Sequence, residues 1–146
     1  MEKTKIEKAS SADLDQVLCL LRENGLPTAG VNELLPNLLI IREGRRIIGC
    51  AGLEVYGRTG LLRSVAVSQD RRNKGNGTLL TKAVLELARE KQVRRLFLLT
   101  TAASGFFRKL GFKEVERKAV SPAIRNSLEF FSVCPESAIA MVASLE

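Results

Sequence analysis

The segment from Leu61 to Leu80, LLRSVAVSQDRRNKGNGTLL, constrains the fold more than any other part of the chain. Its apolar start, Leu61 to Val67, predicts a buried strand, and a turn containing Gly75 and Gly77 separates that strand from an amphipathic helix. Such a turn leaves backbone N–H groups without intrahelical partners at the positive end of the helix dipole. Basic residues flank these donors: Arg71, Arg72 and Lys74. The segment therefore predicts an anion site suited to a diphosphate.

Two familiar phosphate-binding patterns do not fit this turn. The Walker A pattern needs a Gly-Lys-Ser or Gly-Lys-Thr triplet, which the sequence lacks. The dinucleotide fingerprint needs three glycines at fixed spacing, and this turn has two. What remains is R-x-x-G-x-G, between an apolar strand and a helix.

Composition narrows the class of protein and its partners. With 146 residues, 45% hydrophobic and 27% charged, the chain predicts one globular domain over residues 1–146. The charged N-terminus and the absence of a long apolar run predict a cytoplasmic protein with no signal peptide and no membrane partner. There is no histidine, and three widely spaced cysteines form no Cys-x-x-Cys pair, so we expect no metal site. The net charge of +7 favours anionic partners, but the sequence has no Trp and one Tyr, which argues against nucleic acid.

Hydrophobic periodicity predicts a mixed α/β fold in which three consecutive strands form an antiparallel meander. The expected strands are Thr4–Ala9, Leu38–Arg42, Arg46–Val55, Leu61–Val67, Leu96–Thr100, Phe112–Glu116 and Ser137–Val142. The first expected helix begins after Ser10 and ends at Asn24. The other expected helices span Val31–Leu35, Thr78–Glu90, Ala102–Leu110 and Pro122–Phe131. The short connection between the strands that flank Thr78–Glu90 predicts either a parallel pair or a splayed pair.

The R-x-x-G-x-G run resembles the acetyl-CoA-binding motif of the GNAT superfamily of N-acetyltransferases. A second run, FFRKLGF from Phe106 to Phe112, is similar to that superfamily's F-Y-x-K-L-G-F motif. The resemblance extends over nearly the whole chain and implies the GNAT (acyl-CoA N-acyltransferase) fold, a mixed and mostly antiparallel sheet with helices on both faces. It also implies acetyl-CoA as the cosubstrate.

The resemblance implies where that cosubstrate binds. The backbone of Val65, Ala66 and Val67 would hold the pantetheine arm. The pyrophosphate would be cradled by N–H groups of the turn: Arg72, Asn73, Lys74, Gly75, Asn76, Gly77 and Thr78. Asn76 stands where family members commonly have an apolar residue, and we expect this difference to matter little.

Phe107 is the main departure from the family pattern. Many members have a tyrosine there that acts as general acid to the leaving CoA thiolate, and phenylalanine cannot donate a proton. Tyr56 could replace that acid or could only pack, and Ser64 is a further hydroxyl near the expected thioester. Phe107 leaves open a second interpretation, a catalytically weak GNAT-fold protein that senses acetyl-CoA.

Glu54 is the candidate general base, because we do not expect a carboxylate within GCAGLEVYG, beside the cofactor strand, to be ordinary surface. It lies two residues from Tyr56 and so shares a strand face with it. The alternative is a structural carboxylate paired with an arginine such as Arg63. The family resemblance also suggests Thr28, Glu54, Arg63 and Arg125 as substrate-binding groups. Thr28 could equally be a turn former, and each arginine could equally be a solvated side chain.

Further segments resemble a GNAT subgroup associated with arsenic-resistance operons: GLPTAG, GCAGLEVYG, LLRSVAV and SPAIRNSLEFFSVCPESAIAM. That resemblance implies a small amino-acid-like primary amine as the acceptor, such as an organoarsenical analogue of glutamate. The helix before the last strand is also similar to the acetyltransferase domain of N-acetylglutamate synthases. Homodimers are common in the superfamily, but the sequence leaves the oligomeric state open.

Overall fold

The computed structural model describes residues 5–130 and 138–145. It contains one sheet of seven strands in the order β1-β2-β3-β4-β5-β7-β6. The strands are β1 (Lys5–Lys8), β2 (Leu38–Glu43), β3 (Arg46–Tyr56), β4 (Thr59–Val67), β5 (Arg95–Thr100), β6 (Lys113–Val115) and β7 (Ile139–Ser144). All neighbouring pairs are antiparallel except β4 and β5, so the expected mixed, mostly antiparallel sheet is confirmed.

Within the described residues, four α-helices and four short 3-10 helices connect these strands. The α-helices are α1 (Leu14–Glu23), α2 (Asn76–Glu90), α3 (Ser104–Lys109) and α4 (Pro122–Phe130). The 3-10 helices are η1 (Ser11–Asp13), η2 (Val31–Asn37), η3 (Gln69–Arg71) and η4 (Arg117–Ala119). Of the expected boundaries, Thr4, Phe131 and Ser137 lie outside the described residues. Helix α2 begins two residues earlier than expected, and β7 ends at Ser144 because its ladder with β5 continues to Arg95.

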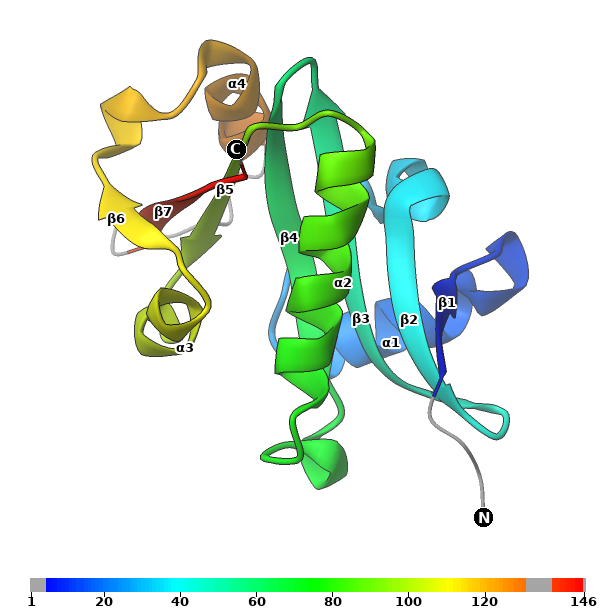
Figure 1. Cartoon of the computed structure of the whole chain (residues 1–146). Helices are drawn as coiled ribbons and strands as arrows, with labels where there is room; N and C mark the ends of the chain where they lie inside the picture. The colour runs from blue at the N-terminus through cyan, green and yellow to red at the C-terminus, as the bar shows by residue number, and fades with distance from the viewer. Residues whose placement is uncertain (1–4, 131–137, 146) are drawn as a thin grey trace.

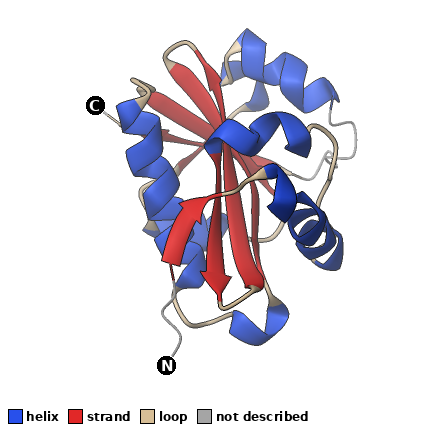
Figure 2. Ribbon diagram, turned by 90° about the vertical axis from the view of Figure 1, so that its right-hand side faces the viewer, coloured by secondary structure: helices blue, strands red, loops and turns tan. Residues whose placement is uncertain are grey.

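Helices cover both faces of the sheet, as Figures 1 and 2 show. Alternation along β2 explains this, because successive side chains of a strand point to opposite faces. Leu39 and Ile41 pack in the core beneath α2, whereas Leu38 and Ile40 pack with α1 and η2 on the other face. No helix among the described residues is long and apolar enough to cross a membrane.

Strand β5 divides the sheet into two parts. Leu96, Phe97 and Leu98 are all buried, as the apolar run predicted, and β5 continues the sheet through β7 and β6. Its parallel pairing with β4 covers only three residues of each strand, from Thr59 to Leu61 on β4. Beyond that point the two strands diverge, and Figure 1 shows β5 angled away from β4 with α3 beyond its end.

Candidate active site

The divergence of β4 and β5 opens a cavity of about 1150 Å³. Its walls come from β4, the start of α2, the segment from Leu98 to Ala103 and the first part of α3, with Asn24 to Pro27 on a further side. The sequence left open whether the strands that flank α2 form a parallel pair or a splayed pair. Strands β4 and β5 do both, because they pair in parallel at one end and diverge at the other.

Most of the predicted cofactor residues line this cavity, namely Val65, Ala66, Val67, Arg72, Asn73, Gly75, Asn76, Gly77, Thr78 and Phe107. Lys74 is exposed and is not among the lining residues. Gly75 precedes α2 with φ of +84°, and Leu79 N–H donates to the Gly75 carbonyl at 3.0 Å. The N–H groups of the three residues between them have no intrahelical acceptor, so they form a donor set at the positive end of α2.

The two arginines of the turn before α2 make different contacts. Arg71 and Arg72 both line the cavity, but Arg71 makes ion pairs with Glu43 and Asp70. The Arg72 guanidinium donates to Asn24 Oδ1 at the end of α1 and to the Val67 carbonyl. The sequence alone gave no signal for these partners, because all except Asp70 and Val67 lie far away in the chain.

Ser64 sits in a β-bulge of β4. Cys50 on β3 pairs with Ala66, whereas Gly52 pairs with Arg63, so one β3 residue faces two on β4. Ser64 has φ of +60°, an uncommon conformation for a residue with a side chain. The bulge turns the β4 backbone at the point where β4 lines the cavity, a known use of bulges next to ligand sites.

Glu54 accepts three hydrogen bonds from side chains. Arg63 Nη1 lies 2.9 Å from Glu54 Oε2, and Ser127 Oγ on α4 donates to Oε1 at 2.7 Å. The Tyr56 hydroxyl also donates to Oε1. The Glu54 and Arg63 side chains are only 14% and 10% exposed, so Glu54 makes the ion pair that the sequence analysis gave as the alternative to a general base.

Arg63 connects this cluster to the cavity, which it lines. It donates to the Ala29 carbonyl at 2.7 Å, in the loop after α1, and to Ser64 Oγ at 3.2 Å. Arg63 and Glu54 thus join strands β3 and β4, the loop containing Ala29, and helix α4. Sequence reasoning did not identify Ser127, because it lies 73 residues from Glu54 and no local pattern marks it.

The other candidate residues lie outside the cavity lining. Tyr56 is half-buried, and burial, followed by its hydrogen bond to Glu54, raises the pKa of its phenol. Thr28 is half-buried, and its carbonyl accepts a hydrogen bond from Val31 at 3.3 Å in a turn. Arg125 is exposed on α4.

Phe107 lies in an aromatic cluster at the edge of the cavity. Its ring meets those of Phe106 and Phe112 edge-on, with centroids 5.0 and 5.7 Å away. Phe106 packs against Gly77 in the first turn of α2, because a Cβ added at Gly77 would lie 3.3 Å from Phe106 Cζ. The two motifs of the sequence therefore meet in space.

A mixed sheet split between two parallel strands, with a glycine turn and a helix start in the split, defines an acyltransferase-type α/β fold. The family model of the acetyltransferase (GNAT) domain matches residues 36–114, and the chain belongs to this family. The GNAT fold expected from the sequence is thereby confirmed.

Individual relatives point the same way. An uncharacterised N-acetyltransferase of Chlorobaculum tepidum is 38% identical over 74 residues, which cover 50% of this chain and 47% of that protein. An amino-acid acetyltransferase of Aeromonas salmonicida is 32% identical over 117 residues, 74% of this chain and 26% of that protein. The chain therefore spans about half the length of the first curated relative and about a quarter of the second.

Among solved structures, N-acetylglutamate synthase of Neisseria gonorrhoeae, complexed with coenzyme A and N-acetyl-glutamate, superposes with a TM-score of 0.85. Its sequence identity is 22%, and the match covers 99% of this chain and 35% of that one. At that identity the likeness shows the fold.

Proposed function

We propose that this chain is an N-acetyltransferase that moves the acetyl group of acetyl-CoA to the primary amine of a small amino-acid-like acceptor. One observation carries the proposal: the β4 bulge, the glycine turn before α2 and the Phe107 cluster line a single cavity. A volume of about 1150 Å³ is enough for a CoA arm and a small acceptor together.

The cosubstrate would lie along the divergent strands. Backbone groups of Val65 to Val67 would bind the pantetheine amides in place of the missing ladder with β5. The N–H groups at the start of α2 and the Arg72 side chain would bind the diphosphate. Glycine at positions 75 and 77 lets the backbone approach the phosphates closely.

The reaction would be a direct attack. The neutral amine nitrogen bonds to the thioester carbonyl carbon, the carbon–sulfur bond breaks, and CoA leaves as a thiolate while the nitrogen loses one proton. Backbone N–H groups at the bulge around Ser64 would stabilise the developing oxyanion. Because Glu54 already accepts three hydrogen bonds and does not line the cavity, we assign the proton to water and assign Glu54 to holding Arg63.

The charges of the cavity favour an acceptor that carries a carboxylate. Three arginines and no aspartate or glutamate stand among its lining residues. Arg71 and Arg72 lie at the diphosphate end, which leaves Arg63, beside the bulge, to attract an acceptor carboxylate.

The resemblance of GLPTAG and neighbouring segments to the arsenic-associated subgroup adds one specific acceptor, an organoarsenical analogue of glutamate. Part of that segment, Leu26 and Pro27, lines the cavity.

A second candidate function, an acetyl-CoA sensor without turnover, is favoured by Phe107, since no phenol is present there to protonate the leaving group. We do not assign Tyr56 to that role, because its hydroxyl donates to Glu54.

Calorimetric titration with acetyl-CoA, followed by a thiol-release screen, tests these proposals. The screen contains amino acids, organoarsenical amino acids, polyamines and aminoglycosides. We expect binding in the micromolar range and CoA release with an amino-acid class acceptor. Binding with no release for any amine would favour the sensor, and no binding at high micromolar acetyl-CoA would exclude both functions.

A further inference from the structure

The loop that precedes α2 is tied to the distant β2–β3 hairpin by an ion-pair network. Glu43, the last residue of β2, makes an ion pair with Arg71, whose Nη2 lies 2.6 Å from Glu43 Oε1. Arg46, the first residue of β3, contacts both carboxylate oxygens of Asp70, at 2.7 and 2.9 Å. Arg71 Nη1 also reaches Asp70 Oδ2 at 3.1 Å, which joins the two pairs into one network.

The network is continuous with the core of the sheet through Ser68. The Ser68 hydroxyl, in a residue only 6% exposed, donates to Asp70 Oδ1 at 2.6 Å, and the Ser68 N–H donates to the Ile48 carbonyl at 2.7 Å. The Arg46 guanidinium beside Asp70 lowers the pKa of that carboxyl, and Arg71 lowers the pKa of Glu43. Both carboxylates are therefore charged at neutral pH.

The segment held by this network, the 71–76 loop, contains one residue, Asn73, in a backbone conformation that is uncommon for a residue with a side chain. Asn73 and Gly75 both have positive φ, of +63° and +84°. The Asn76 amide closes the loop by donating to the Arg71 carbonyl at 3.0 Å. We expected the replacement of the family's apolar residue by Asn76 to matter little. The hydrogen bond to Arg71 gives the Asn76 side chain a role in the shape of the loop.

We propose that Glu43 and Asp70 are positioning residues that hold the 71–76 loop in the conformation that receives the diphosphate of acetyl-CoA. Neither carboxylate lines the cavity, so both act through Arg71 and Arg46. The inference rests on the proposed acetyl-CoA site and adds to it the anchor that preorganises its phosphate-binding loop.

Long-range charge and loop positioning predict opposite changes in acetyl-CoA affinity when these carboxylates are removed. Removing two carboxylates near an anion site should strengthen binding of a polyanion if only long-range charge matters. Removing an anchor should weaken it, because the apparent dissociation constant rises as the competent loop conformation becomes less populated. If that population falls to about a tenth, affinity falls about tenfold.

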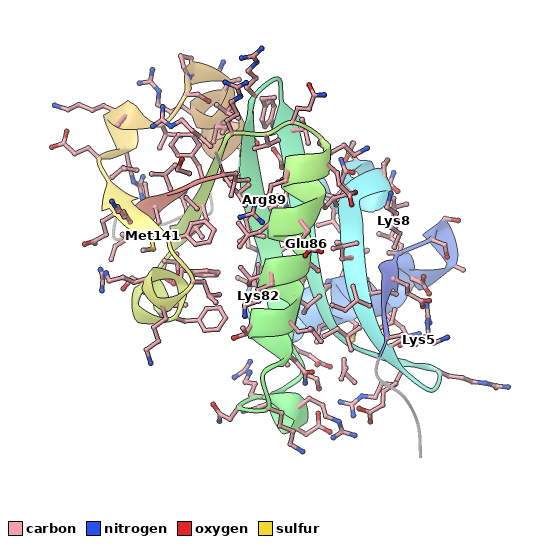
Figure 3. All side chains as sticks on the ribbon, in the orientation of Figure 1. Lys5, Lys8, Lys82, Glu86, Arg89 and Met141 are labelled. Atoms are coloured by element: carbon pink, nitrogen blue, oxygen red, sulfur yellow. The ribbon has the colours of Figure 1, made fainter. Side chains whose placement is uncertain are left out.

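The test compares two double variants that change the net charge equally. Glu43→Gln/Asp70→Asn removes the anchor, whereas Glu86→Gln/Glu90→Gln removes two exposed carboxylates of α2 outside the network; Figure 3 labels Glu86 on the outer side of that helix. We expect the anchor variant to bind acetyl-CoA about fivefold to tenfold more weakly by calorimetry. The control variant should bind as the parent does.

A truncated ligand and hydrogen exchange separate this anchor from general damage. Affinity for S-acetylpantetheine, which lacks the diphosphate, should be the same in the anchor variant and the parent. In the absence of ligand, peptides covering residues 68–78 should exchange faster in the anchor variant, and those covering β5 should not.

Unchanged or tighter acetyl-CoA binding by the anchor variant, or unchanged exchange of residues 68–78, would overturn the inference. A parent protein that does not bind acetyl-CoA would instead refute the proposed function. The exchange experiment would then still show whether the network holds the loop.

Discussion

Glu54 on β3 and Arg63 on β4 form a largely buried ion pair at the wall of the cavity, with 2.9 Å between Oε2 and Nη1. The pair links a strand carboxylate to a guanidinium that also bonds the loop after α1. Arg63 therefore stands at the proposed acceptor side of the cavity, with its orientation fixed by residues from several elements.

Glu54→Gln should destabilise the protein without removing a general base. The free energy of unfolding, from urea denaturation, should fall by about 2 kcal/mol, because a partly buried guanidinium loses its charged partner. The pH profile of kcat/KM with an acceptor from the screen should keep its shape. Loss of the rising limb of that profile would show that Glu54 takes the proton after all.

The double variant Glu54→Gln/Arg63→Met provides the matched control for that pair. Because both partners are then gone, it should be more stable than the sum of the two single changes predicts. Strict additivity would mean that the contact contributes nothing to folding.

Phe107→Tyr should accelerate turnover if departure of the thiolate limits the rate. Phe107 lines the cavity and is 7% exposed, and we expect an added hydroxyl to reach the proposed reacting groups. General acid assistance is typically worth ~10²–10⁴ in rate, and we expect kcat to rise by about 10², at the lower end of that range. An unchanged kcat in thiol-release assays, with acetyl-CoA affinity preserved, would show that no acid is needed at this position.

Gly77→Ala should weaken acetyl-CoA binding through a contact with α3. The new methyl group would lie 3.3 Å from Phe106 Cζ, so the ring or the turn must shift. We expect calorimetry to show about a tenfold loss of affinity, or ~1.4 kcal/mol.

Two further variants serve as a rescue and a control for the loss of affinity in Gly77→Ala. Adding Phe106→Leu should restore part of the affinity by making room for the methyl group. Gly105→Ala, in α3 with open space around its Cβ, should leave the affinity as it is. A Gly77→Ala protein that binds normally would mean that the turn tolerates a side chain.

Asp13 should make stability depend on pH in the acid range. Its carboxylate accepts hydrogen bonds from the Ser10 N–H and from Arg42, both at 2.9 Å, which together lower the pKa of Asp13 below its ordinary value of 3.8. A lowered pKa contributes stability above the ordinary value, and this contribution is lost as pH falls toward the folded-state value.

Asp13→Asn should therefore cost about 1 kcal/mol of unfolding free energy at pH 7, and the difference from the parent should shrink below pH 3. Asp15→Asn, an exposed neighbour on α1, should change stability by less than about 0.5 kcal/mol at either pH. If Asp13→Asn still lowers the unfolding free energy at pH 2, the contribution of Asp13 comes from the geometry of its side-chain contacts and not from its charge.

Local signals explain why much of the fold could be predicted. The β2–β3–β4 meander follows from apolar runs separated by short glycine turns, and α2 follows from a single amphipathic stripe behind Gly75. The glycine turn that lines one end of the cavity was predictable for the same reason, since backbone donors at a helix start need only local sequence, and the binding of the cofactor there stays a prediction.

Features that depend on distant partners were not predictable. The bulge at Ser64 arises from how β3 and β4 register, and the Ser127 bond to Glu54 depends on where α4 docks. Arg71 carries the same charge as Arg72 in the sequence, yet its partners are Glu43 and Asp70, which only the tertiary structure selects.

The short pairing of β4 with β5 also bears on solubility. Past Leu61, the side of β4 that faces β5 has no ladder partner among the described residues, so unpaired backbone groups stand open in the middle of the sheet. At an outer edge such a strand would recruit another chain and begin aggregation. Here the open edge faces a cavity lined by the start of α2 and by α3 and does not lie at the rim of the sheet, so we expect it to be less accessible to a second chain than an outer edge would be.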